Sequence, residues 1–379
     1  MAEQLSVTTK VIVAVIVIVV VTRWITRKRY KLPPGPRSLP LLGNILDFKG
    51  ASVVDKFDEW TKTYGPVVTC YLGPKRLIIV NDFDVMYEVF TRKGSDFSTK
   101  LSTYSIELVT DGFKSIFGAP YGDMLNYQRK ITSRAIRQYL TGDQLEQRVY
   151  ETLQPIIENM KQESAAFNPH RYLSLAGVDT SRHTLDWLFL VLVAYPDVQK
   201  KMQEEIDRVV GDAVPGKEHR SKLVYNEAVL METMRLYYVA PFAVPRVVQR
   251  DTTVGGYEIP AKSLLLTNNL TMMRDPKFWP EPFEFRPERF ISSNEDGTEI
   301  KLASYRHEGW APFQIGHRNC IGESLAKLEL VYVITGLLQK LTFSFARMED
   351  GETPCFDYGT SGFATMTPKP YYVKVTSRS

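Results

Sequence analysis

A lone cysteine on a glycine-bounded loop, directly ahead of a helix-forming run, constrains this chain more than any other feature. Cys320 lies between Gly316 and Gly322, and the helix-forming run extends from Glu323 to Lys340. The N-terminus of a helix carries partial positive charge and unpaired N–H groups, which lower the pKa of a nearby thiol. The spacing therefore predicts that Cys320 is held as a thiolate.

The residues around this cysteine favour a flat ligand that carries carboxylates. Gly316 and Gly322 have no Cβ, so the backbone can approach a planar molecule closely. Arg318 presents a planar fork that suits a carboxylate, and Phe313 is placed to cover the buried side of the sulfur. A soft anionic ligand, a packed aromatic ring and a carboxylate clamp are what a haem iron and its propionates require.

The stretch reads Phe-x-x-Gly-x-Arg-x-Cys-x-Gly, which resembles the haem-binding signature of the cytochrome P-450 haem-thiolate monooxygenases. The resemblance implies a mainly α fold with small β-sheets (α+β). It also implies haem b as the cofactor, with Cys320 as the ligand of its iron. Phe313, Arg318 and Gly322 then belong to the haem-binding set.

Composition limits the alternatives. The chain has 379 residues, 44% of them hydrophobic, so it can bury a large core as one large domain or as two. Its 47 basic against 43 acidic residues leave a net charge of +4, which is too small to indicate a nucleic-acid partner. Three cysteines without a spacing pattern argue against a disulfide framework and fit a reducing compartment. Outside the motif, Cys70 and Cys355 are predicted to be small buried hydrophobes.

The N-terminus predicts a membrane anchor over residues 1–31. Val11 to Val21 are eleven consecutive Val, Ile or Ala residues, with Lys10 before them. Basic residues are denser on the C-terminal side, namely Arg23, Arg27, Lys28, Arg29 and Lys31. By the positive-inside rule the rest of the chain stays cytosolic, which predicts a single-pass protein of the endoplasmic reticulum membrane. A cleaved signal peptide is the alternative. The sequon at Asn269 is then expected to carry no glycan.

Residues 32–379 are predicted to form the catalytic domain. A stiff, proline-rich hinge at 32–36 begins this domain and separates it from the anchor. Apolar periodicity and turn residues predict its elements. The helices are predicted over 53–64, 84–92, 124–140, 144–162 and 197–210. The strands are predicted over 67–71, 76–80, 341–346 and 371–375, with a hairpin over 253–259 and a long loop over 94–120.

A block of the family's fold is missing. Ala176 to Ser181 read Ala-Gly-Val-Asp-Thr-Ser, which in the family lies midway along a very long helix over the haem, yet Pro169 stands only a few residues upstream. The lid helices and the first half of that helix are absent, on the order of a hundred residues. The junction is predicted near residues 172–174. Within the remaining half, the resemblance implies that Asp179 and Thr180 deliver protons, whereas an Asp-Thr-Ser run in a helix otherwise only bonds its own backbone.

The resemblance assigns further roles one residue at a time. Arg129 and Arg246 bind the haem propionates, although Leu125 replaces the family's tryptophan and so removes one hydrogen-bond donor. Glu232, Arg235 and Arg289 form a structural triad around the haem loop. The residues expected to line the substrate pocket are Phe117, Ala176, Ala243, Val244 and Phe363.

The chemistry implied is insertion of one oxygen atom from O2 into a small lipophilic substrate, steroid-like or aromatic. The implied partners are an NADPH-dependent diflavin reductase, with cytochrome b5 as a further donor, steered by basic residues such as Lys130, Arg137 and Lys327. Two alternatives stay open. One is a catalytically inactive, membrane-anchored protein that is haem-binding or haem-free. The other is a haem-thiolate isomerase or synthase that needs no external electrons.

Overall fold

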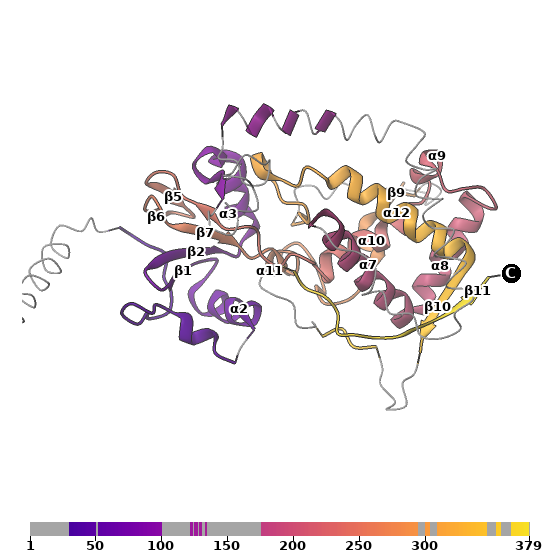
Figure 1. The fold of residues 1–379 in the computed structure, drawn as a ribbon, viewed down its shortest axis with the longest axis horizontal. Coiled ribbons are helices and arrows are strands. Elements are labelled where there is room, and N and C mark those ends of the chain that lie inside the picture. The colour runs from indigo at the N-terminus through magenta and orange to yellow at the C-terminus, as the bar shows by residue number, and fades with distance from the viewer. Residues whose placement is uncertain are drawn as a thin grey trace, which may run out of the picture.

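The computed structural model describes residues 30–50, 52–100, 122–123, 125–127, 129–130, 133–134, 176–294, 300–303, 309–346, 354–357 and 365–378. This described part has a sheet-rich end that carries β1, β2 and β7 and a helix-rich end that carries α7, α8, α10 and α12 (Figure 1). The chain crosses between the two ends more than once, so each end is built from segments that are distant in sequence.

The elements of the sheet-rich end come from both halves of the chain. The helical segments there are η1 (Ile45–Phe48), α2 (Val53–Tyr64), α3 (Phe83–Tyr87), the π-helical η2 (Glu88–Arg92), η3 (Gly94–Phe97) and α11 (Asn269–Met272). The strands are β1 (Val67–Leu72), β2 (Lys75–Val80), β3 (Thr99–Lys100), β4 (Arg246–Val247), β5 (Thr252–Val254), β6 (Tyr257–Ile259) and β7 (Leu264–Thr267).

The helix-rich end contains the longer helices. These helices are α7 (Ala176–Ala194), α8 (Pro196–Val209), α9 (Lys217–Arg220), α10 (Val224–Leu236) and α12 (Glu323–Lys340), with the 3-10 turns η5 (Pro287–Phe290) and η6 (Gly316–Arg318). Its strands are β8 (Ile291–Ser293), β9 (Ile300–Leu302), β10 (Leu341–Phe345) and β11 (Val373–Ser377).

The main sheet has the strand order β1-β2-β7-β4-β3. A tight turn at Gly73, where φ is +58°, joins β1 to β2 and sets an antiparallel register that pairs Val67 with Val80. Strand β7 then adds parallel to β2, with Leu77 opposite Leu264. A parallel pair needs a long crossover, and here the helix-rich end forms part of that crossover. Strand β4 pairs antiparallel with β7, with Arg246 opposite Leu265.

The core of the helix-rich end is built around α7. Its residues from Trp187 to Val193 are all buried and belong to the largest apolar cluster. The ring of Trp187 stacks on that of Tyr237, just beyond α10, with centroids 5.0 Å apart and an interplanar angle of 8°. A stacked pair of this kind adds to the burial of both rings and fixes α7 against the end of α10.

Most predicted elements are confirmed where the structure describes them. The helices over 53–64 and 323–340 have the predicted bounds, and the strands and the hairpin agree to within two residues. The loop predicted over 94–120 is wrong at its start, because η3 and β3 occupy its first residues. The prediction of burial holds for Cys70 but is wrong for Cys355, which is exposed near the end of the chain.

Some predictions lie outside the described residues. These are the anchor over residues 1–29, the helix over 144–162, the junction at 172–174, Arg137, Phe117 and Phe363. Within the part of the chain that is described, no helix is long and apolar enough to cross a bilayer. Asn269 of the sequon lies in α11 with 3% of its surface exposed.

Candidate functional site

The loop that carries Cys320 closes on itself before α12 begins. The backbone N–H of Cys320 donates to the carbonyl oxygen of Phe313 at 2.7 Å, and η6 forms the turn between them. Gly322 precedes the first residue of α12, and a Cβ at this glycine would lie 3.9 Å from the Cys320 Sγ. The thiol is exposed. The loop therefore presents the sulfur on the N-terminal side of a long helix, as the sequence predicts.

Residues 88–98 hold this loop from the sheet-rich end. Gly316 has a φ of +76°, and a Cβ there would lie 2.0 Å from the carbonyl oxygen of Phe90, so only glycine fits. Arg318 donates through Nε to the carbonyl oxygen of Ser98 at 2.8 Å. The position of the cysteine thus depends on backbone contacts with a segment more than 200 residues upstream.

Arg246 is a buried cation without a hydrogen-bonded partner. Only 3% of its surface is exposed, and its Nε and Nη1 atoms make no hydrogen bond within the described residues. Its guanidinium lies 5.6 Å from the ring centroid of Phe90. The pKa of Arg246 is lowered to about 10, mainly by burial and then by the positive charges of Arg318 and Arg129. The side chain therefore needs an anion.

Arg318 shares this environment. Its pKa is also lowered to about 10, first by burial and then by the charge of Arg129. The guanidinium groups of Arg129, Arg246 and Arg318 thus lie close enough to one another for their charges to interact, with Arg129 also near Cys320. Arginine forks match carboxylates, so the two propionates of a haem would satisfy this cluster. The residues present fit the cofactor that the motif predicts.

The structure gives Arg129 a hydrogen-bond partner on the cysteine loop, and its predicted contact with a propionate stays a prediction. Its Nη2 donates to Asn319, at 2.6 Å to Oδ1 and at 3.1 Å to the carbonyl oxygen. Burial lowers the pKa of Arg129, and the nearby Cys320 opposes that effect. On the same segment Leu125 is 0% exposed. In this arrangement Arg129 holds the cysteine loop.

A cavity of about 630 Å3 opens beside the cysteine. Cys320, Asn319 and Arg129 form one side of it, and residues of α10 and α12 form the other. Trp310 lines its wall, with Lys327 Nζ 4.8 Å from the ring centroid, and Lys327 also pairs with Glu323 at 2.8 Å. The cavity explains why the Cys320 side chain is exposed rather than packed.

Glu232, Arg235 and Arg289 come together as the sequence predicts. Arg235 donates through Nε and Nη2 to the Glu232 carboxylate at 2.6 and 2.9 Å, and Arg289 Nε reaches the same group at 3.0 Å. Arg235 also donates to the carbonyl oxygens of Met273 and Pro282. These contacts tie α10 to the segment that leads into η5, so the triad is structural.

The structure describes fewer contacts for the residues that are predicted to act on the substrate. Asp179 is half-buried and Thr180 is exposed near the start of α7, and the Thr180 carbonyl accepts a hydrogen bond from Thr184 at 2.9 Å. Ala243 is buried and Val244 half-buried in the segment before β4. Ala176 begins α7, and its side chain lies outside what the structure describes, as do Phe117 and Phe363.

Three residues that contact the loop were not found from the sequence. Asn319 occupies a variable position of the motif, whereas Ser98 and Tyr238 are far from it in the chain. Ser98 acts through its carbonyl oxygen, which no side-chain pattern reveals. Tyr238 donates its hydroxyl to the Pro312 carbonyl at 2.8 Å. A variable position and two long-range contacts leave no signal in a single sequence.

Comparison with known proteins agrees with this geometry. The sequence model of the family described as Cytochrome P-450 matches residues 33–174 and 171–375, in two segments. Cytochrome P-450 2A12 of Mus musculus is 25% identical over 481 positions, covering 93% of this chain and 95% of that protein. Because the chain has 379 residues, roughly a hundred or more of those positions are gaps in it.

Other relatives match about half of the chain at a higher identity. Cytochrome P-450 2U1 of Homo sapiens is 38% identical over 207 residues, which cover 54% of this chain and 36% of that protein. Cytochrome P-450 2J3 of Rattus norvegicus is 42% identical over 172 residues, covering 45% of this chain and 33% of that protein. In these alignments the chain spans about a third of the relative's length. The chain belongs to the cytochrome P-450 family, whose members bind haem b through a cysteine thiolate.

Proposed function

We propose that this protein is a haem-thiolate monooxygenase that inserts one oxygen atom from O2 into a small lipophilic substrate, steroid-like or aromatic. The observation that carries the proposal is Arg246, a cation with 3% of its surface exposed and no hydrogen-bonded anion in the described part of the chain, close to Arg318. Burying an unpaired charge is unfavourable, so the fold is completed by a dianionic ligand at this position.

Each residue of the site has a task that follows from its chemistry. Cys320 supplies the thiolate ligand, and Arg246 and Arg318 neutralise the propionates. The bound haem supplies the activation of dioxygen. Asp179 and Thr180 are placed by the family pattern to pass protons through the carboxylate and Oγ1. Ala243 and Val244 present small apolar side chains before β4, which suits a lipophilic substrate.

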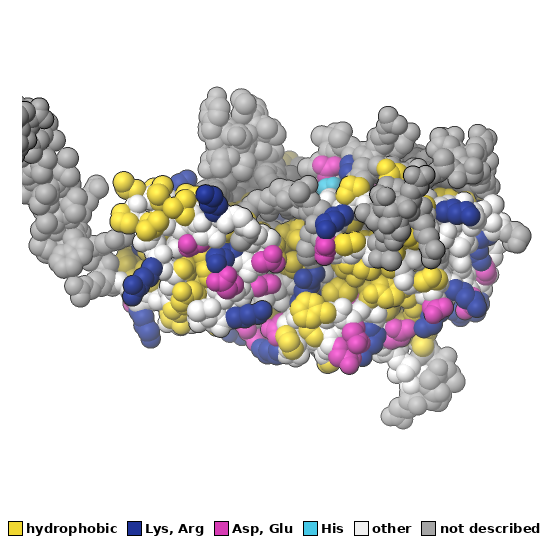
Figure 2. Space-filling view, turned by 90° about the horizontal axis from the view of Figure 1, so that it is seen from below, with side chains coloured by type: hydrophobic (Ala, Val, Ile, Leu, Met, Phe, Trp, Pro, Cys, Tyr) yellow, Lys and Arg dark blue, Asp and Glu magenta, His cyan; other side chains and the backbone are white. Residues whose placement is uncertain are grey.

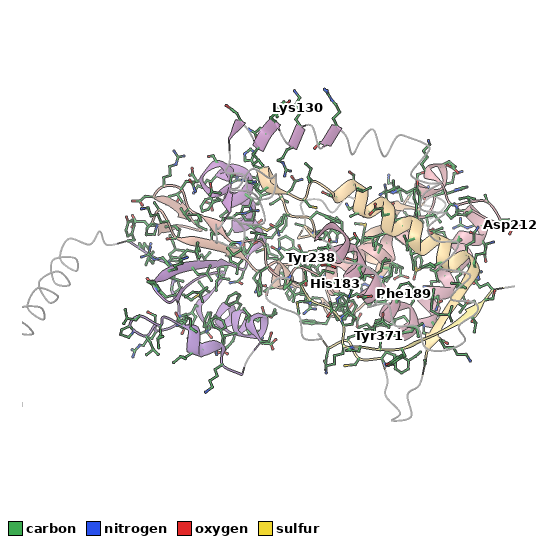
Figure 3. The ribbon with its side chains drawn as sticks, viewed as in Figure 1. Lys130, His183, Phe189, Asp212, Tyr238 and Tyr371 are labelled. Atoms are coloured by element: carbon green, nitrogen blue, oxygen red, sulfur yellow. The ribbon has the colours of Figure 1, made fainter. Side chains whose placement is uncertain are left out.

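The electron donor we propose is an NADPH-dependent diflavin reductase, with cytochrome b5 as a second donor. Lys130 supports this assignment because it is exposed and points away from the body of the molecule (Figure 3). Lys327 is a weaker candidate, since its ammonium already pairs with Glu323 at 2.8 Å. Exposed cations steer an acidic partner more effectively than paired ones.

We further propose that the chain is anchored in the endoplasmic reticulum membrane by its first 31 residues. Hydrophobic side chains gather on the surface at the end of the molecule where the described chain begins (Figure 2). The large exposed apolar residues of that region are Leu39, Leu41, Leu42, Ile45 and Leu46. A contiguous exposed apolar patch is typical of a membrane or protein contact, and here it directly follows the proposed anchor.

The test is the absorption spectrum of the haem-loaded protein after reduction and exposure to carbon monoxide. We expect a strongly red-shifted band in the wild type and its loss in Cys320→Ser. Cys355→Ser, which alters the other exposed cysteine, is the matched control and should keep the band. Incorporation of labelled O2 into a steroid or polycyclic aromatic, with reductase and NADPH present, then tests turnover. A wild type without the red-shifted band would overturn the proposal.

One observation favours a second candidate, a catalytically inactive haem-binding or haem-free membrane protein. The alignment with a full-length relative contains roughly a hundred more positions than this chain fills, and the family model matches the chain in two segments that meet at residues 171–174. Thr180, which is expected to face the haem, is exposed near the first residue of α7. A red-shifted band without labelled product would support this candidate over the monooxygenase.

A further inference from the structure

A tyrosine hydroxyl lies behind the loop that carries Cys320. Tyr238 follows the end of α10 and is 5% exposed, and Figure 3 shows it near the centre of the molecule. Its hydroxyl donates to the carbonyl oxygen of Pro312 at 2.8 Å. The side-chain amide of Asn269, the first residue of α11, donates to the same hydroxyl at 3.4 Å. Tyr238 thus joins two other segments through one oxygen atom.

The position of the Pro312 carbonyl affects the position of Cys320. Pro312 directly precedes Phe313, whose own carbonyl accepts the Cys320 N–H at 2.7 Å. Two neighbouring carbonyls are therefore each held by a hydrogen bond, that of Pro312 by Tyr238 and that of Phe313 by the cysteine itself. A shift of the Pro312 end of the loop would be transmitted through the Phe313 hydrogen bond to the sulfur-bearing residue.

The beginning of this loop has few other hydrogen bonds. The Gln314 N–H donates to the Ala311 carbonyl oxygen at 3.1 Å, but Gln314 has a φ of +62°, which is unfavourable for a residue with a side chain. Its buried Oε1 and Nε2 atoms make no hydrogen bond of good geometry among the described residues, although the side chain lies near the Tyr238 hydroxyl and opposes the rise in its pKa. The Oδ1 atom of Asn269 is likewise unpaired there. Little else therefore compensates if the Tyr238 hydroxyl is removed.

We propose that Tyr238 is a positioning residue for the thiolate: its hydroxyl fixes the Pro312–Phe313 segment and so the placement of Cys320. The proposal rests on the thiolate ligation proposed above but concerns a group that does not itself touch the haem. Burial raises the pKa of Tyr238 to about 12, so the hydroxyl remains a neutral donor throughout the physiological range. One such hydrogen bond changes a local opening equilibrium by roughly three- to tenfold.

The experiment compares Tyr238→Phe with Tyr225→Phe. Tyr225 is the matched control, because it lies on α10 and its buried hydroxyl has no hydrogen-bond partner among the described residues. Both substitutions are made in a Cys355→Ser background, which leaves Cys320 as the exposed thiol while Cys70 stays buried. The first readout is the rate at which iodoacetamide alkylates Cys320 in the haem-free chain at fixed pH. The second is the rate at which the reduced, carbon-monoxide-treated haem protein loses its red-shifted band.

For Tyr238→Phe we expect both rates to rise roughly three- to tenfold, and for Tyr225→Phe we expect them to remain at the wild-type values. Asn269→Leu, which leaves the Tyr238 hydroxyl less well oriented, should raise both rates by a smaller factor. It serves as the second variant if Tyr238→Phe does not fold. Unchanged rates in Tyr238→Phe, or an equal rise in Tyr225→Phe, would overturn the proposal. If the wild type takes up no haem, the proposed function fails while the alkylation rates still decide the role of Tyr238.

Discussion

Arg235 and Glu232 form a two-point ion pair in which both side chains are 0% exposed. Arg289 makes a third contact of 3.0 Å to the same carboxylate, so two guanidinium groups share one anion. Such a pair stabilises the fold only while it is complete, because removing one partner leaves an uncompensated charge away from water. The complete triad is therefore needed to hold α10 against the segment that leads to η5.

Glu232→Gln should lower the free energy of unfolding by about 3–5 kcal/mol, since Arg235 and Arg289 then lose their shared anion. Denaturant unfolding followed by circular dichroism measures the loss. Glu204→Gln is the control, because the Lys200–Glu204 pair is exposed and 4.0 Å long, and its loss should change stability by about 0.5 kcal/mol or less. Equal losses in the two variants would contradict the structural role of the triad.

Arg246→Met should have opposite effects in the haem-free and haem-loaded protein. Without haem it removes a buried unpaired charge and should raise the free energy of unfolding by on the order of 2 kcal/mol. With haem it removes a propionate partner and should speed haem release. Thermal unfolding of both forms and haem transfer to an excess of apomyoglobin measure the two effects. A loss of stability in the haem-free form would contradict the assignment of Arg246 to an absent anion.

The lowered pKa of Arg246 predicts that the free energy of unfolding depends on pH. The folded-state pKa of Arg246 is lowered to about 10 from its ordinary value of 12.5, mainly by burial. Between these values the unfolded chain binds more protons than the folded chain, so this group makes the free energy of unfolding rise with pH. The destabilising effect is fully present below about pH 10. The stability gained by Arg246→Met in the haem-free form should therefore be constant from pH 7 to 9 and shrink above pH 10.

Arg129 and Asn319 should behave as one unit in haem retention. Arg129→Ala and Asn319→Ala each remove the contact of 2.6 Å, so both should loosen the loop and speed haem release. In a double-mutant cycle the two changes should be non-additive, with a coupling free energy of about 1–2 kcal/mol. Additive effects would instead mean that Arg129 contacts a propionate directly and acts independently of Asn319.

Gln314→Gly should stabilise the haem-free protein by about 1 kcal/mol, because glycine adopts a positive φ without strain and carries no buried amide. Gln314→Ala separates the two causes, since alanine removes the amide but keeps the Cβ at a φ of +62°. A shift of the thermal midpoint measures both changes. A lower midpoint for glycine than for alanine would show that the backbone at this position is not strained.

The sequence alone was sufficient for features that depend on local chemistry. The helix from Glu323 to Lys340, the turn at Gly73 and the glycine at 316 follow from spacing, φ preferences and the absence of a Cβ. The order of the family's motifs could also be determined from the sequence, because each motif is continuous in the chain. The triad of Glu232, Arg235 and Arg289 was found from two short motifs, although its geometry needed the fold.

Only the tertiary structure decided which groups meet at the loop. Arg246 is buried on β4 between β3 and β7, where its Nε and Nη1 atoms meet no hydrogen-bond partner among the residues that the structure describes. Arg129 reaches Asn319 across 190 residues of sequence. The exposure of Cys355 and the bond from Tyr238 to Pro312 depend likewise on packing between distant segments. A sequence determines residue chemistry and local periodicity, whereas burial and the distances between remote side chains arise only when the core is assembled.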